Sequence, residues 1–161
     1  MQTVLPVAQR GDAILDLVAA PVSAQEFGSA WLQALAQAMQ ATMEERRGVG
    51  IAAPQVYVSK QVIIVASRPN LRYPDAPEME AVFMVNPEIL SMSEQTVWGE
   101  EGCLSVPNER GSVARAQEIW VRYSTLGGEQ VEQKFSGFPA RIVQHEVDHL
   151  NGILFVDHLS A

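Results

Sequence analysis

The sequence Gln144-His-Glu-Val-Asp-His149 (QHEVDH) lies in a segment, residues 139–150, that we predict to be a helix of about three turns. A proline suits the first turn of that helix, and the Asn-Gly pair after it suits its end. Residues i and i+4 share a helix face, so His145 and His149 can bind one cation through ring nitrogens about 2.0–2.1 Å from it. Glu146 can then reach a metal-bound water, as in the H-E-x-x-H pattern of hydrolytic metal sites. The alternative is two helix histidines beside a surface glutamate.

Length and composition predict one soluble domain. The chain has 161 residues, of which 47% are hydrophobic and 19% charged, enough apolar material for a core without disulfide bonds. Its formal net charge of −8 repels nucleic-acid phosphates and anionic membrane, so we expect neither as a partner. The single cysteine, Cys103, cannot form an internal disulfide, and the amino-terminal sequence is not that of a signal peptide. We therefore expect a reducing, cytoplasmic location and no transmembrane helix.

Periodicity predicts an α+β fold with antiparallel sheet. Ser23-Ala-Gln-Glu26 is a capping-box sequence, and apolar residues recur after it at three-to-four-residue spacing, so we predict a helix from there to about Arg46, capped by Gly48. The proline-rich residues 68–80 are expected to form a loop, and Leu126-Gly-Gly-Glu129 a hairpin turn. The runs predicted as strands are residues 61–67, 81–85 (ended by Asn86-Pro87), 94–100, 118–125 and 130–135.

Two further segments carry candidate site residues. Cys103 lies within Gly99–Pro107, where glycines let the backbone bend sharply. A catalytic metal site on the helix needs a third protein ligand, for which Cys103 or a carboxylate is the candidate. Alone, such a cysteine is more typical of a small buried hydrophobe. In the segment Gly48–Gln55, the glycines allow close approach to a ligand and Gln55 offers an amide donor; the alternative is a helix cap followed by a turn.

Together the three segments resemble the signature motifs of the peptide deformylase family. These motifs are a Gly-Φ-Gly-Φ-Ala-Ala-x-Gln loop (Φ apolar), a Glu-Gly-Cys-Leu-Ser segment and Gln-His-Glu-x-Asp-His. Here they stand at Gly48–Gln55, Glu101–Ser105 and Gln144–His149, in the family's order and with similar spacing, and the resemblance extends from about Val7 to Ser160. It implies one compact catalytic domain, residues 1–161, with antiparallel β-sheets around a central helix that carries the HExxH motif.

The resemblance implies a metal-dependent hydrolase that removes the formyl group from the N-terminal formyl-Met of nascent polypeptides. Cys103, His145 and His149 would be the metal ligands, and Glu146 would be the general acid/base. The native metal of the family is typically Fe²⁺, and Zn²⁺, Ni²⁺ or Co²⁺ can also occupy the site. A divalent ion lowers the pKa of its bound water from 15.7 toward about 7, so that hydroxide can attack the formyl carbon at neutral pH.

Substrate-binding roles follow in the same way. Gln55 and the backbone N–H of Leu104 would form the oxyanion site, and Gly50 would help to align the substrate backbone. The candidates for contacts beyond the reacting group are Val49, Phe138 and Ile142, as an apolar pocket for methionine, and Arg110, as a contact to substrate backbone. The alternatives are that the three apolar residues are ordinary core and that Arg110 is a solvated loop residue.

Two features depart from the family pattern. Many bacterial members continue into a basic C-terminal helix that serves ribosome docking, whereas this sequence stops at Ala161, so we expect no docking by that route. Residues 11–16 lack the arginine often found after the leucine of that region. Neither departure touches the expected ligands. We further expect a monomer, with His158 at its surface.

Two other functions stay open from the sequence. A different metallohydrolase, such as a peptidase or amide hydrolase, would be distinguished by its substrate. A catalytically weak relative that only binds peptide or metal is disfavoured, because Gln55, Cys103, His145, Glu146 and His149 are all present.

Overall fold

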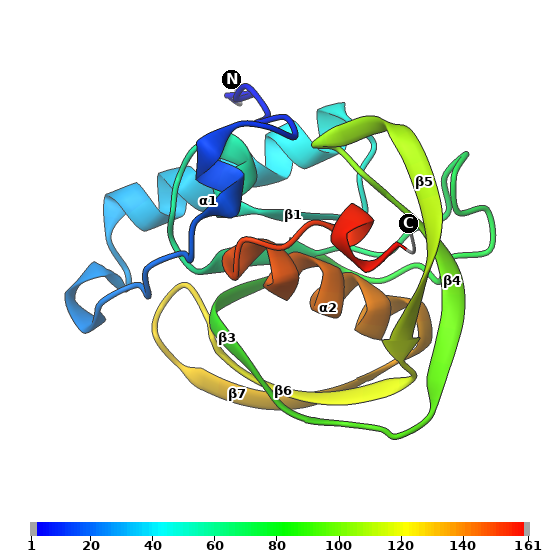
Figure 1. Ribbon diagram of the computed structural model, residues 1–161. Coiled ribbons are helices and arrows are strands. Elements are labelled where there is room, and N and C mark those ends of the chain that lie inside the picture. The colour runs from blue at the N-terminus through cyan, green and yellow to red at the C-terminus, as the bar shows by residue number, and fades with distance from the viewer. Residues whose placement is uncertain (1–2, 160–161) are drawn as a thin grey trace.

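Antiparallel sheets surround helix α2 in the computed structural model, which describes residues 3–159 (Figure 1). Within these residues the long helices are α1 (Ala30–Glu45) and α2 (Gly137–Leu150), and short 3₁₀ turns lie at Ala13–Asp16, Ala24–Glu26, Ala53–Val56 and Phe155–His158. The strands are β1 (Gly50–Ala52), β2 (Val62–Val65), β3 (Val82–Met92), β4 (Thr96–Cys103), β5 (Val106–Ala116), β6 (Glu118–Ser124) and β7 (Gln130–Ser136). One sheet has the order β1-β2-β3-β6-β7, and β4 pairs with β5 in a second. The expected α+β fold around the motif helix is confirmed; Ser160 and Ala161 lie outside the described residues.

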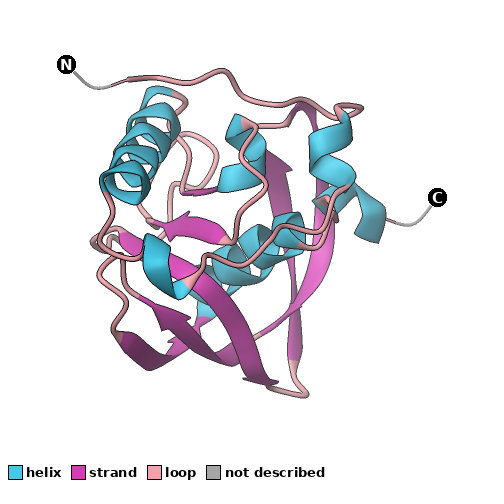
Figure 2. Ribbon diagram, turned by 90° about the vertical axis from the view of Figure 1, so that its left-hand side faces the viewer, coloured by secondary structure: helices cyan, strands magenta, loops and turns pink. Residues whose placement is uncertain are grey.

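Strand β2 is buried on both faces, and its alternation separates two layers of the core. Ile63 and Val65 belong to the apolar cluster that includes residues of α2, whereas Val62 and Ile64 belong to the cluster that includes residues of α1. Because successive side chains of a strand point to opposite faces, the two helices cover opposite faces of this part of the sheet. Figure 2 shows strands between the two long helices.

Polar side chains attach α2 to the second sheet. Gln144 accepts a hydrogen bond from the backbone N–H of Ala116 (3.0 Å) and donates one to the Ala116 carbonyl (2.9 Å). Arg141 donates to the carbonyls of Val97 (2.6 Å) and Val113 (2.8 Å). A buried polar group left without a partner costs about 1–3 kcal/mol, so these bonds favour a single orientation of α2 against β4 and β5. That orientation turns the motif histidines toward the interior.

The predicted start of the first helix at Ser23 is wrong. The capping box at Ser23 is present, but it serves only the short turn Ala24–Glu26. Gly28 then adopts φ +75°, which interrupts the helical path. Ser29 caps α1 by accepting a hydrogen bond from the N–H of Leu32 (3.2 Å). The sequence holds two capping serines, and the left-handed glycine between them determines that the second begins the helix.

The predicted cap at Gly48 is also displaced by one residue. The left-handed position after α1 is occupied by Arg47, with φ 56°. The N–H of Gly48 donates to the carbonyl of Met43 (2.9 Å) and that of Arg47 to the carbonyl of Glu44 (3.0 Å), the two bonds of a Schellman motif. The need for glycine at position 48 has another cause, because a Cβ there would lie 3.2 Å from the side chain of Leu104.

Strand β3 does not end at Asn86-Pro87 as predicted. Asn86 adopts φ 51° at a shift in the register between β3 and β6, and the strand continues to Met92. The Asn86 side chain accepts a hydrogen bond from the N–H of Val22 (2.8 Å) and donates to its carbonyl (3.0 Å). These bonds hold an irregular residue inside the strand, which the Asn-Pro pair alone does not reveal.

The other strand predictions hold with changed limits. The loop 68–80 and the β6–β7 hairpin are confirmed. Strand β4 continues beyond Glu100 to Cys103, and strands β1 and β5 are additions to the predicted set. β1 is only three residues long, and β5 carries few apolar residues, so neither gives a clear periodic signal. No helix in the described part of the chain has the length and apolar character needed to cross a membrane.

The start of α1 can be tested by comparing two serines. Ser29→Ala is expected to lower the free energy of unfolding by about 1 kcal/mol, because it removes the cap of a long helix. Ser23→Ala alters only a three-residue turn and is expected to change that energy by less than about 0.5 kcal/mol. Chemical denaturation measures both variants, and equal losses in the two would contradict the assignment of Ser29 as the cap.

Candidate metal centre

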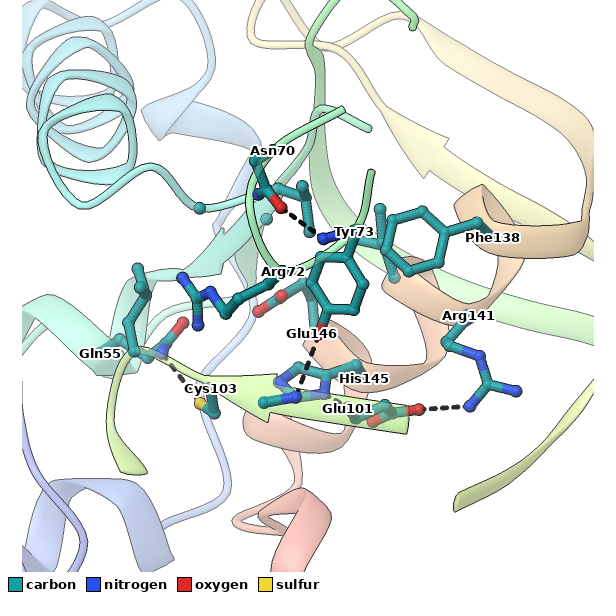
Figure 3. A pocket seen from close by; sticks show the side chains of 16 residues that line it. Gln55, Asn70, Arg72, Tyr73, Glu101, Cys103, Phe138, Arg141, His145 and Glu146 are labelled. Atoms are coloured by element: carbon teal, nitrogen blue, oxygen red, sulfur yellow. Dashed lines mark hydrogen bonds and ion pairs between the residues drawn. The ribbon is translucent and has the colours of Figure 1, made fainter. Parts of the chain in front are cut away.

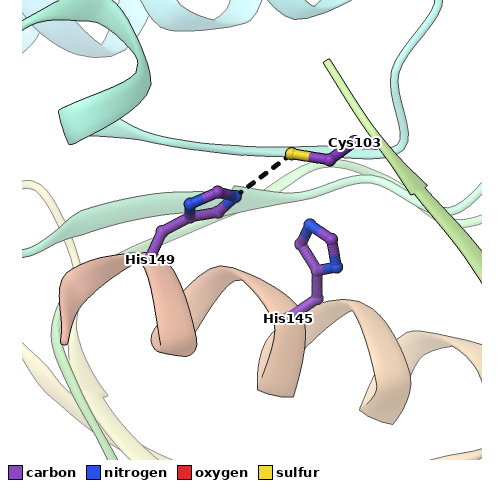
Figure 4. A group of neighbouring side chains, drawn as sticks. All are labelled: Cys103, His145 and His149. Carbon is purple, nitrogen blue, oxygen red and sulfur yellow. Dashed lines mark hydrogen bonds between the residues drawn. The ribbon is translucent and has the colours of Figure 1, made fainter. Parts of the chain in front are cut away.

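The three residues expected to be ligands come together inside the protein. Cys103, at the end of β4, faces His145 and His149 on α2 (Figure 4). All three are buried, and their ligand atoms lie within 4.8 Å of one another. The distance between Cys103 Sγ and His149 Nε2 is 3.4 Å. Ligand atoms bonded to one tetrahedral ion at about 2.0–2.3 Å stand roughly 3.3–3.6 Å apart, so this group fits a divalent metal ion.

Glu101 orients His145. Its Oε1 lies 2.9 Å from His145 Nδ1, which leaves Nε2 as the ring nitrogen available to a metal. A carboxylate on the far nitrogen of a metal-binding histidine fixes the ring and raises its basicity. The same carboxylate accepts hydrogen bonds from Arg115 (2.9 Å, through both oxygens) and from Arg141 (2.7 Å). One buried acid therefore links β4, β5 and α2 at the candidate ligands.

The charges of this cluster favour a thiolate at Cys103 and a protonated imidazole at His145. Burial acts to raise the pKa of Glu101, but hydrogen bonds from Arg115 and His145 outweigh it and hold that pKa well below its usual range. Burial also opposes ionisation of Cys103, yet the imidazoles of His149 and His145 lower the pKa of the thiol. Burial lowers the pKa of His145, but contacts with Cys103 and Glu101 outweigh it and raise the pKa. A cation between thiolate and imidazole can replace the proton that they share.

Glu146 is buried beside the candidate ligands and has one carboxylate oxygen without a hydrogen-bond partner among the described residues. Among the described residues nothing forms a hydrogen bond with its Oε1. Burial raises the pKa of Glu146 to about 7, although His145 and His149 act to lower it. A carboxyl group with a pKa near neutrality can accept a proton and return it within one reaction cycle. The geometry therefore suits the general acid/base role expected for this residue.

The backbone of β1 approaches α2 so closely that Gly50 must be glycine. A Cβ at Gly50 would lie 2.7 Å from both Glu146 Oε2 and Ile142 Cγ2. Because β1 is at the edge of its sheet, its outer backbone groups are not used by a neighbouring strand of that sheet. Gly50 thus brings a free strand edge to the candidate acid/base.

The two residues expected at the oxyanion site border the same group. Gln55 accepts a hydrogen bond from the N–H of Ala52 (2.9 Å), and its Nε2 donates to Ser105 Oγ (3.1 Å) and to Cys103 Sγ (3.5 Å). Leu104 and Ser105 form the two-residue turn between β4 and β5, and Leu104 lines the pocket described next.

A pocket opens onto the candidate metal group (Figure 3). Val49, Phe138 and Ile142, the apolar residues expected to receive methionine, all line it. The loop 68–80 supplies a wall that sequence reasoning missed. The Tyr73 ring packs against that of Phe138, with centroids 4.7 Å apart, and its hydroxyl accepts a hydrogen bond from the N–H of Gly102 (3.1 Å).

Arg110 does not line this pocket. Its guanidinium lies 5.1 Å from the centroid of the Tyr73 ring and pairs with Glu100, in an adjoining groove. Its contact with substrate backbone stays a prediction. His158 is exposed, as expected, and is hydrogen-bonded to Asp148 (2.8 Å).

Sequence reasoning missed several residues of the site, among them Glu101, Tyr73 and Arg141; Asn70 and Arg72 of the loop 68–80 also line the pocket. Glu101 carried one available signal, because it stands two positions before Cys103, and residues i and i+2 of a strand face the same side. Tyr73 gave none, since it lies in an irregular loop far from the motifs in the sequence. Arg141 stands one helical turn before His145, so helix periodicity alone places it near the motif face.

Comparison with known proteins agrees with this geometry. The family model described as polypeptide deformylase matches residues 4–161. A protein of Shewanella oneidensis named peptide deformylase 2 is 50% identical over 153 residues, covering 95% of this chain and 83% of its own length. A Met-Ala-Ser-bound crystal structure of class I type b peptide deformylase from Acinetobacter baumannii has 71% identity and a TM-score of 0.97, covering 99% and 100% of the two chains. The peptide deformylase structure from Thermotoga maritima has 34% identity and a TM-score of 0.86, covering 98% and 99%.

The role of Glu101 can be tested with a substitution that keeps its shape. Glu101→Gln removes the negative charge shared by His145 and two buried arginines. It is expected to weaken metal binding by about 10–100-fold and to lower the free energy of unfolding by about 3–5 kcal/mol. Competition with a chelator measures the first effect and chemical denaturation the second. Glu100→Gln, at an exposed neighbour, is the matched control and should change neither. Wild-type metal affinity in Glu101→Gln would show that the carboxylate does not support the ligand.

Proposed function

The chain belongs to the polypeptide deformylase family, and we propose that it removes the formyl group from the N-terminal methionine of nascent polypeptides through the residues of this metal centre. Water is consumed, the C–N bond of the formyl amide breaks, and formate and a free amino terminus are released. The observation that carries the proposal is the convergence of Cys103, His145 and His149 beside Glu146, at a pocket with apolar walls.

We propose that Cys103, His145 and His149 hold one divalent ion, with Fe²⁺ as the native metal and Zn²⁺, Ni²⁺ or Co²⁺ as alternatives. Thiolate and imidazole ligands suit these transition metals rather than Mg²⁺ or Ca²⁺. When bound, the ion supplies Lewis acidity and makes water a nucleophile near neutral pH. A thiolate ligand is sensitive to oxidation, which supports a reducing, cytoplasmic location.

Protein groups then transfer the proton of the attacking water and stabilise the negative charge that develops on the formyl oxygen. Glu146 accepts a proton from the attacking water and passes it to the leaving nitrogen, a role suited by its pKa of about 7. Gln55 Nε2 and the N–H of Leu104 donate to the formyl oxygen as it becomes negative. Such preorganised donors are worth about 3–4 kcal/mol each at the barrier. The 3.5 Å contact of Gln55 Nε2 with Cys103 Sγ is the weaker of its two donated bonds, so a substrate oxygen can replace it.

Pocket and strand edge position the substrate. Val49, Phe138 and Ile142 receive the methionine side chain, and Tyr73 extends that wall. An extended peptide backbone lies along the free edge of β1 at Gly50, by strand addition. The Met-Ala-Ser peptide bound in the relative from Acinetobacter baumannii supports a peptide in this place.

We also propose the extent of the catalytic domain and the oligomeric state of the protein. The family match to residues 4–161 supports one catalytic domain spanning residues 1–161, of which the structure describes 3–159. We propose that the enzyme works as a monomer, since ligands, acid/base and pocket walls all come from one chain.

Substitution of the acid/base tests this function. Glu146→Gln is expected to keep one divalent ion per chain but to lower kcat for formyl-Met-Ala-Ser by about 10²–10⁴-fold, because the amide cannot carry the proton. Metal analysis after anaerobic loading and an assay for released formate measure the two effects.

Wild-type turnover in metal-loaded Glu146→Gln would overturn the role of Glu146. Blocked internal peptides serve as the substrate control for a different metallohydrolase. Cleavage of those peptides by the wild-type protein, without release of formate from formyl-Met-Ala-Ser, would overturn deformylation itself.

A further inference from the structure

A groove rich in arginine continues from the active-site pocket. It is lined by the end of α1 and by the loop that follows β2, and it shares Gly48, Asn70 and Arg72 with the pocket. A peptide whose formyl-Met occupies the pocket therefore has a path along the groove for the residues that follow. The arginines of this groove are Arg46, Arg47, Arg68 and Arg72, and all four are exposed.

These four arginines differ from the other lysines and arginines of the chain. The sequence has 11 lysines and arginines, and each of the other seven forms an ion pair with a carboxylate. Among the ion pairs and side-chain hydrogen bonds of residues 3–159, none uses the guanidinium of a groove arginine. In a chain of net charge −8, the unpaired positive charge is thus gathered beside the active site.

Local structure does not account for all of this charge. Arg46 and Arg47 follow the C-terminal end of α1, where positive charge is favourable. Arg68 and Arg72 lie in a loop and have no such role. One acid, Glu44, lines the groove with the four arginines, so the groove keeps an excess of positive charge.

The other groove at the pocket mouth differs in charge. It is lined by Arg72, which it shares with the arginine groove, by Arg110 and Arg141, which pair with Glu100 and Glu101, and by Asp75. Its charges largely cancel, whereas those of the arginine groove do not. Electrostatics therefore distinguishes these two grooves as paths for a bound peptide.

We propose that the arginine groove binds the residues downstream of formyl-Met and favours substrates with carboxylate side chains there. This inference rests on the proposed deformylation and adds a substrate preference to it. Acidic peptide suits the groove better than RNA does. The groove is continuous with the pocket that takes the reacting end, and none of the described residues that line it is aromatic, whereas single-stranded RNA sites stack bases on aromatic rings.

The test compares two C-terminally amidated peptides, formyl-Met-Ala-Glu-Glu-Ser and formyl-Met-Ala-Gln-Gln-Ser. The acidic peptide is expected to have a kcat/KM about threefold to tenfold higher at low salt, mainly through KM, because several exposed ion pairs each contribute weakly. The ratio should fall toward one as salt screens the charges. In R46Q/R47Q/R68Q the ratio of the two kcat/KM values should be close to one, and kcat/KM for the neutral peptide should change by less than about twofold. K60Q/R122Q/K134Q, which removes the same charge away from the groove, should keep the wild-type ratio.

A binding measurement separates this inference from the proposed function. Metal-loaded Glu146→Gln can be titrated with fluorescent versions of both peptides, so that no turnover is required. Equal dissociation constants for the two peptides at low salt would overturn the acidic-substrate groove, even if wild-type protein releases formate from both. Tighter binding of the acidic peptide without release of formate by the wild type would instead overturn deformylation and keep the groove. Tight binding of an RNA oligonucleotide that needs Arg46, Arg47 and Arg68, with no preference between the peptides, would assign the groove to nucleic acid and overturn the proposal.

Discussion

The buried carboxylate of Glu101 is the interaction on which the rest of the site depends. It accepts hydrogen bonds from Arg115 on β5 and Arg141 on α2, and it contacts His145. Any one of these charges left alone in the interior would be strongly destabilising, so the four side chains favour a single arrangement. That arrangement fixes α2 against the β4–β5 sheet and turns His145 toward Cys103. The geometry of the candidate ligands is therefore a consequence of how the β4–β5 sheet and helix α2 share one buried charge.

Around this centre, apolar residues of the pocket and unpaired charged residues of the adjoining groove occupy different places. The pocket residues proposed to meet methionine are apolar or aromatic, and the polar groups that line the same pocket include Gln55, Glu146 and two candidate ligands, Cys103 and His145. Buried arginines are neutralised by buried acids, and exposed lysines and arginines elsewhere pair with surface carboxylates. Unpaired cations stand together on the groove that leaves the pocket. The reaction in the pocket and charge recognition in the arginine groove can thus act on different parts of one substrate, the formyl-Met residue and the residues that follow it.

Features that depend on local residue spacing can be predicted from this sequence, whereas contacts between segments distant in the sequence cannot. The spacing of His145 and His149 indicates a shared helix face directly, and the motif around Cys103 indicates a third candidate ligand, so the grouping of these three residues could be predicted. Glu101 could not be assigned its role, because its partners lie on two other elements. The wall formed by Tyr73 depends on how an irregular loop crosses the pocket. The start of α1 does not follow from the local pattern, because Ser23 and Ser29 both suit a cap position and only the left-handed backbone at Gly28 distinguishes them.

Metal content after anaerobic loading of Cys103→Ser tests the central claim most directly. Strand β4 places the Cys103 sulfur beside two imidazoles of α2, and we propose that the three side chains together bind one divalent ion. Wild-type protein should retain about one ion per chain through gel filtration in the presence of a weak chelator. Cys103→Ser should lose most of its metal under the same conditions, because a hydroxyl is a poor substitute for a thiolate ligand. Wild-type stoichiometry and affinity in that variant would contradict the account, because Cys103 would then not be a ligand.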